Sequence, residues 1–147
     1  MGLFDKISSE RQQNQTLGPA EAFAAIALLA VAADGYAAES EVQSIMTSLS
    51  RMHLFRSYPG DVMKKMFDRL LSILQRQGPD TLLAAALGSL PHELRETAFA
   101  VTTDIALADG EVTEEEEYFL NQLYGVLEIS EETAVKIIDV MLIKNRG

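Results

Sequence analysis

The sequence predicts an all-α protein, a compact bundle of about seven helices with an internal two-fold helix–turn–helix repeat. Glycine and proline punctuate the chain at intervals of helical length. Between these breaks, apolar residues recur at three- and four-residue spacing, and no segment shows the alternation typical of a strand. In addition, two stretches of the chain match each other at a constant offset of 75 residues.

Turn signals place the boundaries of the helices. These signals are Gly18-Pro19, Asp34-Gly35, Pro59-Gly60, Gly78-Pro79, Leu90-Pro91 and Asp109-Gly110. The helices predicted between them cover residues 20–33, 42–54, 62–74, 82–87, 94–108, 113–127 and 133–144. Together they form one domain over residues 18–147, preceded by an N-terminal tail or short helix over residues 1–17.

The first predicted helix is the most apolar. Residues 22–33 form an uninterrupted apolar run of twelve residues, shorter than the roughly 18 residues of a membrane span, so we expect a buried helix. Pro19 and Pro79 fit the first position of the first and fourth helices, where a missing N–H costs little.

The last two predicted helices carry their own start signals. Thr113 and Glu116 have the spacing of a capping box, and Ser130 fits the N-cap of the final helix. Apolar residues on one stripe of the 113–127 helix are Phe119, Leu120, Leu123, Tyr124 and Leu127. This stripe predicts that one side of the helix is buried.

The repeat, about residues 20–55 and 95–130, keeps acidic residues in matching places. Asp34 and Glu41 in the first copy match Asp109 and Glu116 in the second. Each Asp is followed by glycine, and each Glu stands seven residues after the Asp, as in the second half of an EF-hand calcium loop. The earlier ligands of that loop are missing, so a metal site would have to draw on both copies.

Structural roles explain part of the same pattern. An Asp-Gly pair can end a helix, and Glu116 can cap its own helix with Thr113. In the first copy Ala38 replaces the threonine while Glu41 is retained, so capping does not fully account for the glutamates. Metal binding and a purely structural turn both remain open.

Three further acids are candidate ligands. Glu39 and Glu114 match each other across the repeat, which favours Glu114 over its neighbours Glu115 and Glu117. Asp104 lies on an otherwise apolar helix, where it either faces solvent or turns towards the acidic cluster.

Composition excludes several classes of function. The net charge is −10, and residues 109–132 contain nine acids without a Lys or Arg, so nucleic-acid binding is not expected, whereas cations and basic partners would be attracted. The absence of cysteine excludes disulfides and thiolate sites. With no secretory signal at the N-terminus, we expect a cytoplasmic protein without a membrane span. His53 and His92 adjoin no nucleophile motif.

The two Ala-Asp-Gly turns, each closing an alanine-rich helix and followed by Glu41 or Glu116, resemble the TerB-like family, named for the tellurite resistance protein TerB. The resemblance covers roughly residues 20–127, and the opening Leu3-Phe4-Asp5-Lys6 is also similar to the family's N-terminus. It implies a helical bundle whose two turns approach each other and hold a divalent cation such as Ca²⁺ through Asp34, Glu41, Asp109 and Glu116.

The resemblance also implies a non-enzymatic scaffold or sensor linked to tellurite and chemical-stress resistance. A membrane protein of the TerC type would be its partner and would hold it at the inner face of the membrane. Two other functions are open: a metal-independent interaction module whose acidic face meets a basic partner, and, less favoured because no base or nucleophile is visible, a metal-dependent hydrolase. The sequence does not predict an oligomeric state.

Overall fold

The computed structural model describes residues 17–32, 36–108 and 110–146, and over these residues it confirms the all-α prediction, with seven α-helices and no strand. The α-helices are α2 (Pro19–Leu29), α3 (Glu39–Ser50), α4 (Gly60–Gln77), α5 (Pro79–Ser89), α6 (Arg95–Leu107), α7 (Glu114–Val126) and α8 (Glu131–Lys144). Two short 3₁₀ helices, η1 (His53–Phe55) and η2 (His92–Leu94), join them. Of the predicted N-terminal tail only Leu17 is described, and it is buried.

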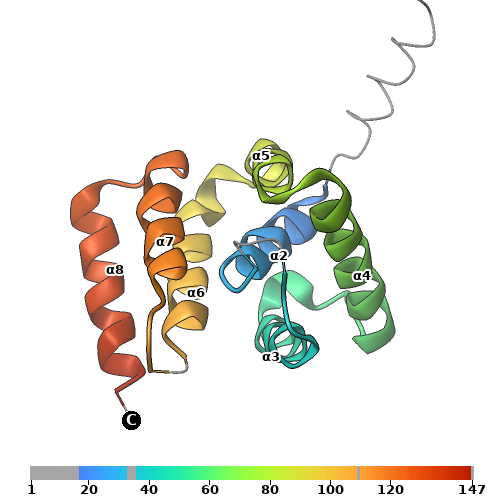
Figure 1. The fold of residues 1–147 in the computed structure, drawn as a ribbon, viewed down its shortest axis with the longest axis horizontal. Coiled ribbons are helices and arrows are strands. Elements are labelled where there is room, and N and C mark those ends of the chain that lie inside the picture. The colour runs from blue at the N-terminus through green and yellow to red at the C-terminus, as the bar shows by residue number, and fades with distance from the viewer. Residues whose placement is uncertain (1–16, 33–35, 109, 147) are drawn as a thin grey trace, which may run out of the picture.

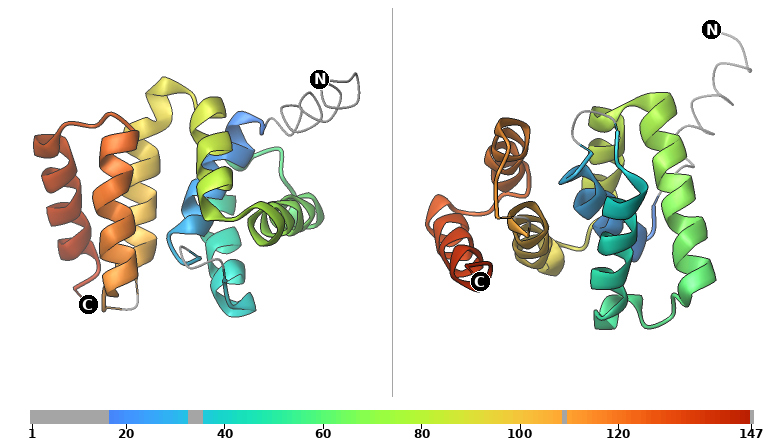
Figure 2. Two further views of the ribbon diagram at one scale, coloured as in Figure 1. Left: turned by 45° about the horizontal axis from the view of Figure 1, so that its top comes forward. Right: turned by 60° about the horizontal axis from the view of Figure 1, so that its bottom comes forward.

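The helices form two groups, which we call the first lobe (α2 to α5) and the second lobe (α6 to α8) (Figure 1). Helix α2 packs against α3, α4 and α5 and also against α6, so it belongs to the core of the first lobe and to the contact between the lobes. Helix α6 packs against α2, α7 and α8, and α8 lies at the outer edge of the second lobe (Figures 1 and 2).

The sequence of α2 explains its central position. Nine of its eleven residues are buried, and five of these nine are alanines, whose small side chains let the neighbouring helices approach closely. A helix that is apolar on all sides is stable only when it is enclosed. The ring of Phe23 meets that of Phe55 from η1 edge to face, with centroids 6.2 Å apart. Among the described helices, none is both long and apolar enough to cross a membrane.

The long helix α4 is amphipathic and covers the first lobe with a single apolar stripe. Its buried residues are Met63, Met66, Phe67, Leu70, Ile73 and Leu74. The helix ends at Gly78, whose φ of +88° lies in the region that glycine adopts without strain, and Pro79 begins α5 directly afterwards, as predicted. The chain therefore changes direction between α4 and α5 at one residue.

The predicted repeat is present as two helix–turn–helix units, α2 with α3 and α6 with α7. The first helix ends at Leu29, earlier than the predicted residue 33, because Ala30 and Val31 donate to the carbonyls of Ala27 and Leu28 in a tightened last turn. Helix α3 begins at Glu39, three residues before the predicted start. The boundaries moved by a few residues, but each predicted helix exists.

Candidate functional site

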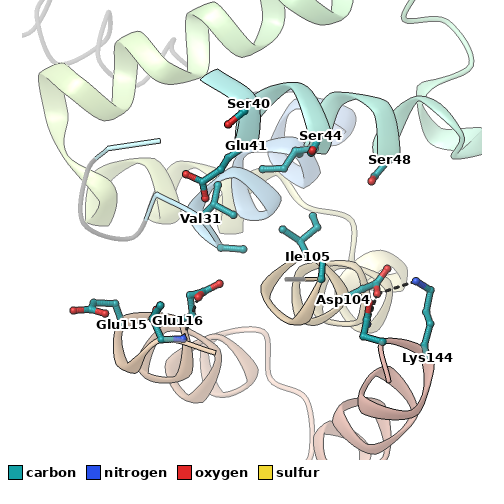
Figure 3. Close-up of a pocket in the computed structure, with 15 residues that line it drawn as sticks. Val31, Ser40, Glu41, Ser44, Ser48, Asp104, Ile105, Glu115, Glu116 and Lys144 are labelled. Atoms are coloured by element: carbon teal, nitrogen blue, oxygen red, sulfur yellow. Dashed lines mark hydrogen bonds and ion pairs between the residues drawn. The ribbon is translucent and has the colours of Figure 1, made fainter. Parts of the chain in front are cut away.

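The two repeats enclose a groove of about 700 Å³, which we call the repeat groove. Its apolar lining consists of Ala30, Val31, Ile45, Ile105 and Ala108. Its polar lining consists of Ser40, Glu41, Ser44, Ser48, Asp104, Thr113, Glu115, Glu116, Lys144 and Asn145. The C-terminal ends of α2, α6 and α8 therefore meet the N-terminal ends of α3 and α7 around one space (Figure 3). Its volume is in the range of about 300–1,000 Å³ typical of ligand pockets.

The two repeat-matched glutamates both reach the groove. Glu41 extends into it from the first turn of α3, and Glu116 extends into it from the first turn of α7 on the opposite side (Figure 3). Each carboxylate accepts a hydrogen bond through Oε1 from the backbone N–H at the start of its helix, Ala38 N at 3.3 Å and Thr113 N at 3.1 Å. No described residue donates to either Oε2 atom.

The two helix starts differ in one hydrogen bond. Thr113 Oγ1 accepts from the Glu116 N–H at 3.1 Å, which completes a reciprocal capping box. Ala38 has no side-chain oxygen, so only the Glu41 half of the box exists at α3. Helix α3 therefore has one fewer side-chain partner for its first N–H groups than α7.

Replacing Ala38 with threonine should raise the free energy of unfolding by about 0.5–2 kcal/mol, because the new hydroxyl can accept from the Glu41 N–H. Chemical denaturation measures the change. The reverse replacement, Thr113→Ala, is the matched control and should lower the free energy of unfolding by a similar amount. Equal stabilities of Ala38→Thr and the parent protein would show that the start of α3 does not adopt this geometry.

Helix ends set the electrostatic field of the groove. The last residues after α2 and α6, Ala30 and Ala108, line the groove, and the partial negative charge of a helix C-terminus favours a cation there. The N-terminal ends of α3 and α7, which hold Glu41 and Glu116 in their first turns, carry partial positive charge. Helix ends of both signs therefore border the groove, together with the ammonium group of Lys144.

Asp104 lines the groove but has partners of its own. Its Oδ1 accepts from Lys144 Nζ at 3.1 Å and from Asn145 Nδ2 at 2.8 Å, and Asn145 Nδ2 also donates to the carbonyl of Met141. Asp104 is half-buried, with 32% of its side chain exposed. Of the two predicted alternatives, solvent or the acidic cluster, the structure has Asp104 lining the groove together with Glu41 and Glu116. Its bonds also fasten the C-terminal end of α8 to α6, which the sequence did not predict. A cation at Asp104 would compete with Lys144.

Among the remaining candidate acids, the one that lines the groove is not the one that the sequence favoured. Glu115 lines the groove, whereas Glu39 and Glu114 are not among its lining residues. Successive helical positions are turned by about 100°, so Glu114 and Glu115 cannot share a direction. The repeat gives no signal for Glu115, because the residue that matches it in the first copy is Ser40, which is not an acid.

Two predicted ligands, Asp34 and Asp109, lie outside the described residues. The residue after Asp109 is described: Gly110 has φ +84° and donates to the Leu107 carbonyl at 3.0 Å, as expected for a glycine that closes a helix. Within residues 17–32, 36–108 and 110–146, no three His, Cys, Asp or Glu side chains form a group that could hold a metal ion. The ligand set Asp34, Glu41, Asp109 and Glu116 therefore stays a prediction.

The donor set of the groove is chemically uniform. Four carboxylates and four hydroxyl groups supply oxygen atoms, and oxygen is the donor that Ca²⁺ and Mg²⁺ prefer. The single described ammonium group of the lining, Lys144, is already paired with Asp104. Neither histidine of the chain is a lining residue, so the groove has no imidazole to act as a general base.

Comparison with known proteins gives one family. The model of the family described as tellurite resistance protein TerB matches residues 20–138, which is most of the 147-residue chain. The curated proteins give no match to this sequence, and neither do the solved structures. The matched range contains both helix–turn–helix units apart from Pro19, the first residue of α2, and it contains all of the repeat-matched acids.

Proposed function

The chain belongs to the TerB family of tellurite resistance proteins, and on that premise we propose that it is a non-catalytic domain that binds a divalent cation, in the first place Ca²⁺, in the repeat groove. The domain would act as a scaffold or sensor in tellurite or chemical-stress resistance. Binding would report the presence of the cation through the relative position of the two lobes.

One observation carries the proposal: Glu41 and Glu116, which match across the repeat, approach the same groove from opposite lobes. Each has one oxygen fixed by a backbone N–H and the other without a donor among the described residues. The fixed oxygen lowers the entropy lost when the side chain binds an ion. Asp34 and Asp109, each seven residues before its glutamate, would complete a set of four carboxylates for the six to eight oxygens that calcium takes.

Calorimetric titration of metal-stripped protein with Ca²⁺, and then with Mg²⁺, tests the proposal. We expect saturable heat for the parent chain and its loss in the double variant Glu41→Gln/Glu116→Gln. Glutamine keeps the oxygen that caps the helix but removes the charge, so the fold should survive. The matched control is Glu39→Gln/Glu114→Gln, which removes the same charge from repeat-matched positions outside the groove and should retain the heat.

The thermal midpoint gives a second readout. A ligand that binds only the folded protein stabilises it by about 2.7 kcal/mol at a hundredfold excess over Kd. For a domain of this size, each kcal/mol of added stability raises the thermal midpoint by roughly 2–4 °C. An unchanged midpoint across millimolar Ca²⁺, together with no heat in the parent chain, would reject the proposal. Heat that persists in Glu41→Gln/Glu116→Gln would place the ion elsewhere.

A second candidate function is a metal-independent interaction module. The first turn of α7 exposes Glu114, Glu115 and Glu117, which together form an acidic surface for a basic partner. A TerC-type membrane protein is the partner we propose, on family grounds alone. Ionic strength separates the two functions, because attraction between exposed charges falls steeply with added salt whereas a chelated ion loses less.

A further inference from the structure

The charged side chains of the repeat groove are separated from one another. Glu41 and Glu116 lie at one end of the groove, and Asp104 with Lys144 lies at the other end (Figure 3). Within the part of the chain that the structure describes, no three acidic or histidine side chains form a group that could hold one metal ion. The described carboxylates therefore suit a ligand whose positive charges are separated as well.

The groove is elongated, because one of its walls follows α3. Ser40, Ser44 and Ser48 line this wall at every fourth position. Residues four apart share one side of a helix, and with a rise of about 1.5 Å per residue these three span about 12 Å along the axis. Between the two charged ends lies Ile105 (Figure 3), and Ile45 adds to the aliphatic lining. The groove thus has charged ends, hydroxyl groups along one wall and aliphatic side chains in between.

Lys144 shows which chemical group the Asp104 end of the groove accepts. Its ammonium group donates to Asp104 Oδ1 at 3.1 Å, so a primary amine on an alkyl chain already occupies this end. The pair is open to solvent, since 58% of the Lys144 side chain and 32% of the Asp104 side chain are exposed. Ion pairs of this kind add little stability. An ammonium group from outside can therefore take the place of Lys144 at low cost.

Charge and size narrow the class of ligand further. The described lining holds four carboxylates and one ammonium group, which leaves three negative charges in excess, so the groove attracts cations and repels anions. Its volume of about 700 Å³ is that of a pocket for an organic molecule. The aliphatic lining between the charged ends is complementary to methylene groups. An organic cation with an alkyl chain satisfies all three conditions.

From these observations we propose that the repeat groove binds a linear aliphatic polyamine. One terminal ammonium group replaces Lys144 at Asp104, the other lies at Glu41 and Glu116, and the methylene groups between them pack against Ile105. This ligand goes beyond the divalent cation proposed above. The two ligands share Glu41 and Glu116 and would compete, but polyamine binding also uses Asp104 and can be measured without any divalent ion.

A series of amines tests whether both ends of the groove are used. Calorimetric titration of the metal-stripped, full-length chain compares octamethylenediamine with putrescine, which carries the same charge on a chain half as long, and with octylamine, which has the same chain but a single ammonium group. Octamethylenediamine should bind at least about tenfold more tightly than either, because only this ligand can place an ammonium group at each end. Spermidine, which has a similar length and a further ammonium group, should bind at least as tightly.

Two variants of opposite expected effect test the Asp104 end. Asp104→Asn should weaken binding of octamethylenediamine about tenfold, because it removes the charge that meets one ammonium group. Lys144→Gln should instead tighten binding at least about threefold, because it removes the internal competitor. Asp139→Asn and Lys136→Gln are the matched controls: they remove the same charges from exposed positions on α8 outside the groove and should leave the dissociation constant unchanged. Circular dichroism checks that each variant is folded.

General attraction between an acidic chain and amines would produce neither the dependence on length nor the gain in Lys144→Gln. The proposal fails if no diamine binds, if putrescine binds as tightly as octamethylenediamine, or if Asp139→Asn weakens binding as much as Asp104→Asn. It also fails if trilysine binds more tightly than octamethylenediamine, which would assign the groove to lysine side chains of a protein partner. Heat with Ca²⁺ but with no amine would reject this proposal alone, and the reverse would reject only the divalent cation.

Discussion

Replacing Leu29 with aspartate should destabilise the protein by at least about 4 kcal/mol, a large part of the 5–15 kcal/mol typical of a domain. Leu29 is 1% exposed at the end of α2, where the first lobe meets the second. Aspartate is the residue at the matching repeat position, Asp104. The substitution therefore tests whether α2 can accommodate the aspartate that α6 carries at the matching position. We expect that it cannot, because a carboxylate at Leu29 would be buried among apolar side chains.

The opposite exchange, Asp104→Leu, is the matched control. It removes the hydrogen bonds from Lys144 and Asn145 at a position that is partly open to solvent, so we expect a loss of no more than about 1–2 kcal/mol. Urea unfolding followed by circular dichroism measures both variants. Similar losses for the two would contradict the difference in burial between α2 and α6.

Phe23→Ala should cost about 3–5 kcal/mol, because the side chain is 1% exposed and the surrounding helices cannot fully close the space that it leaves. Its ring contacts the ring of Phe55, which in turn lies edge to face against the ring of Tyr58, with centroids 5.6 Å apart. Loss of the Phe23 ring therefore also removes a packing contact of η1. The same unfolding measurement applies. The m-value should stay constant if only stability changes.

Tyr118→Ala is the control for the loss of an aromatic ring. Tyr118 is 65% exposed on α7, and its ring makes no aromatic contact with another described residue, so we expect a change of less than about 1 kcal/mol. A loss for Phe23→Ala as small as that for Tyr118→Ala would mean that α2 is not the centre of the core.

The sequence was sufficient to predict the helices and the burial of α2. An apolar run without a polar side can only be enclosed, and the Gly-Pro and Asp-Gly breaks marked where each helix had to stop or start. The sequence was not sufficient to predict the residues at which the helices begin and end. The early end at Leu29 depends on the hydrogen bonds of Ala30 and Val31, which alanine and valine do not signal in advance.

The candidate site was predictable where the repeat supplied information. The 75-residue offset singled out Glu41 and Glu116, and both line the repeat groove; their role as metal ligands remains a prediction. The pairing of Asp104 with Lys144 and Asn145 was not predictable, because it joins residues 40 and 41 positions apart through the packing of α8 on α6. The repeat match favours Glu114, but the direction of each side chain on α7 decides which acid reaches the groove, and that acid is Glu115.

Helices α8 and α2 differ in how their backbones can become exposed to solvent. Helix α8 contacts the bundle on one side only, so its backbone can exchange with solvent through a local opening that leaves the other helices in place. Helix α2 contacts four helices from both lobes and buries nine of its eleven residues, while Pro19 at its start is exposed. Opening of α8 therefore leaves the buried residues of α2 covered, and these become accessible only when the helices around α2 separate.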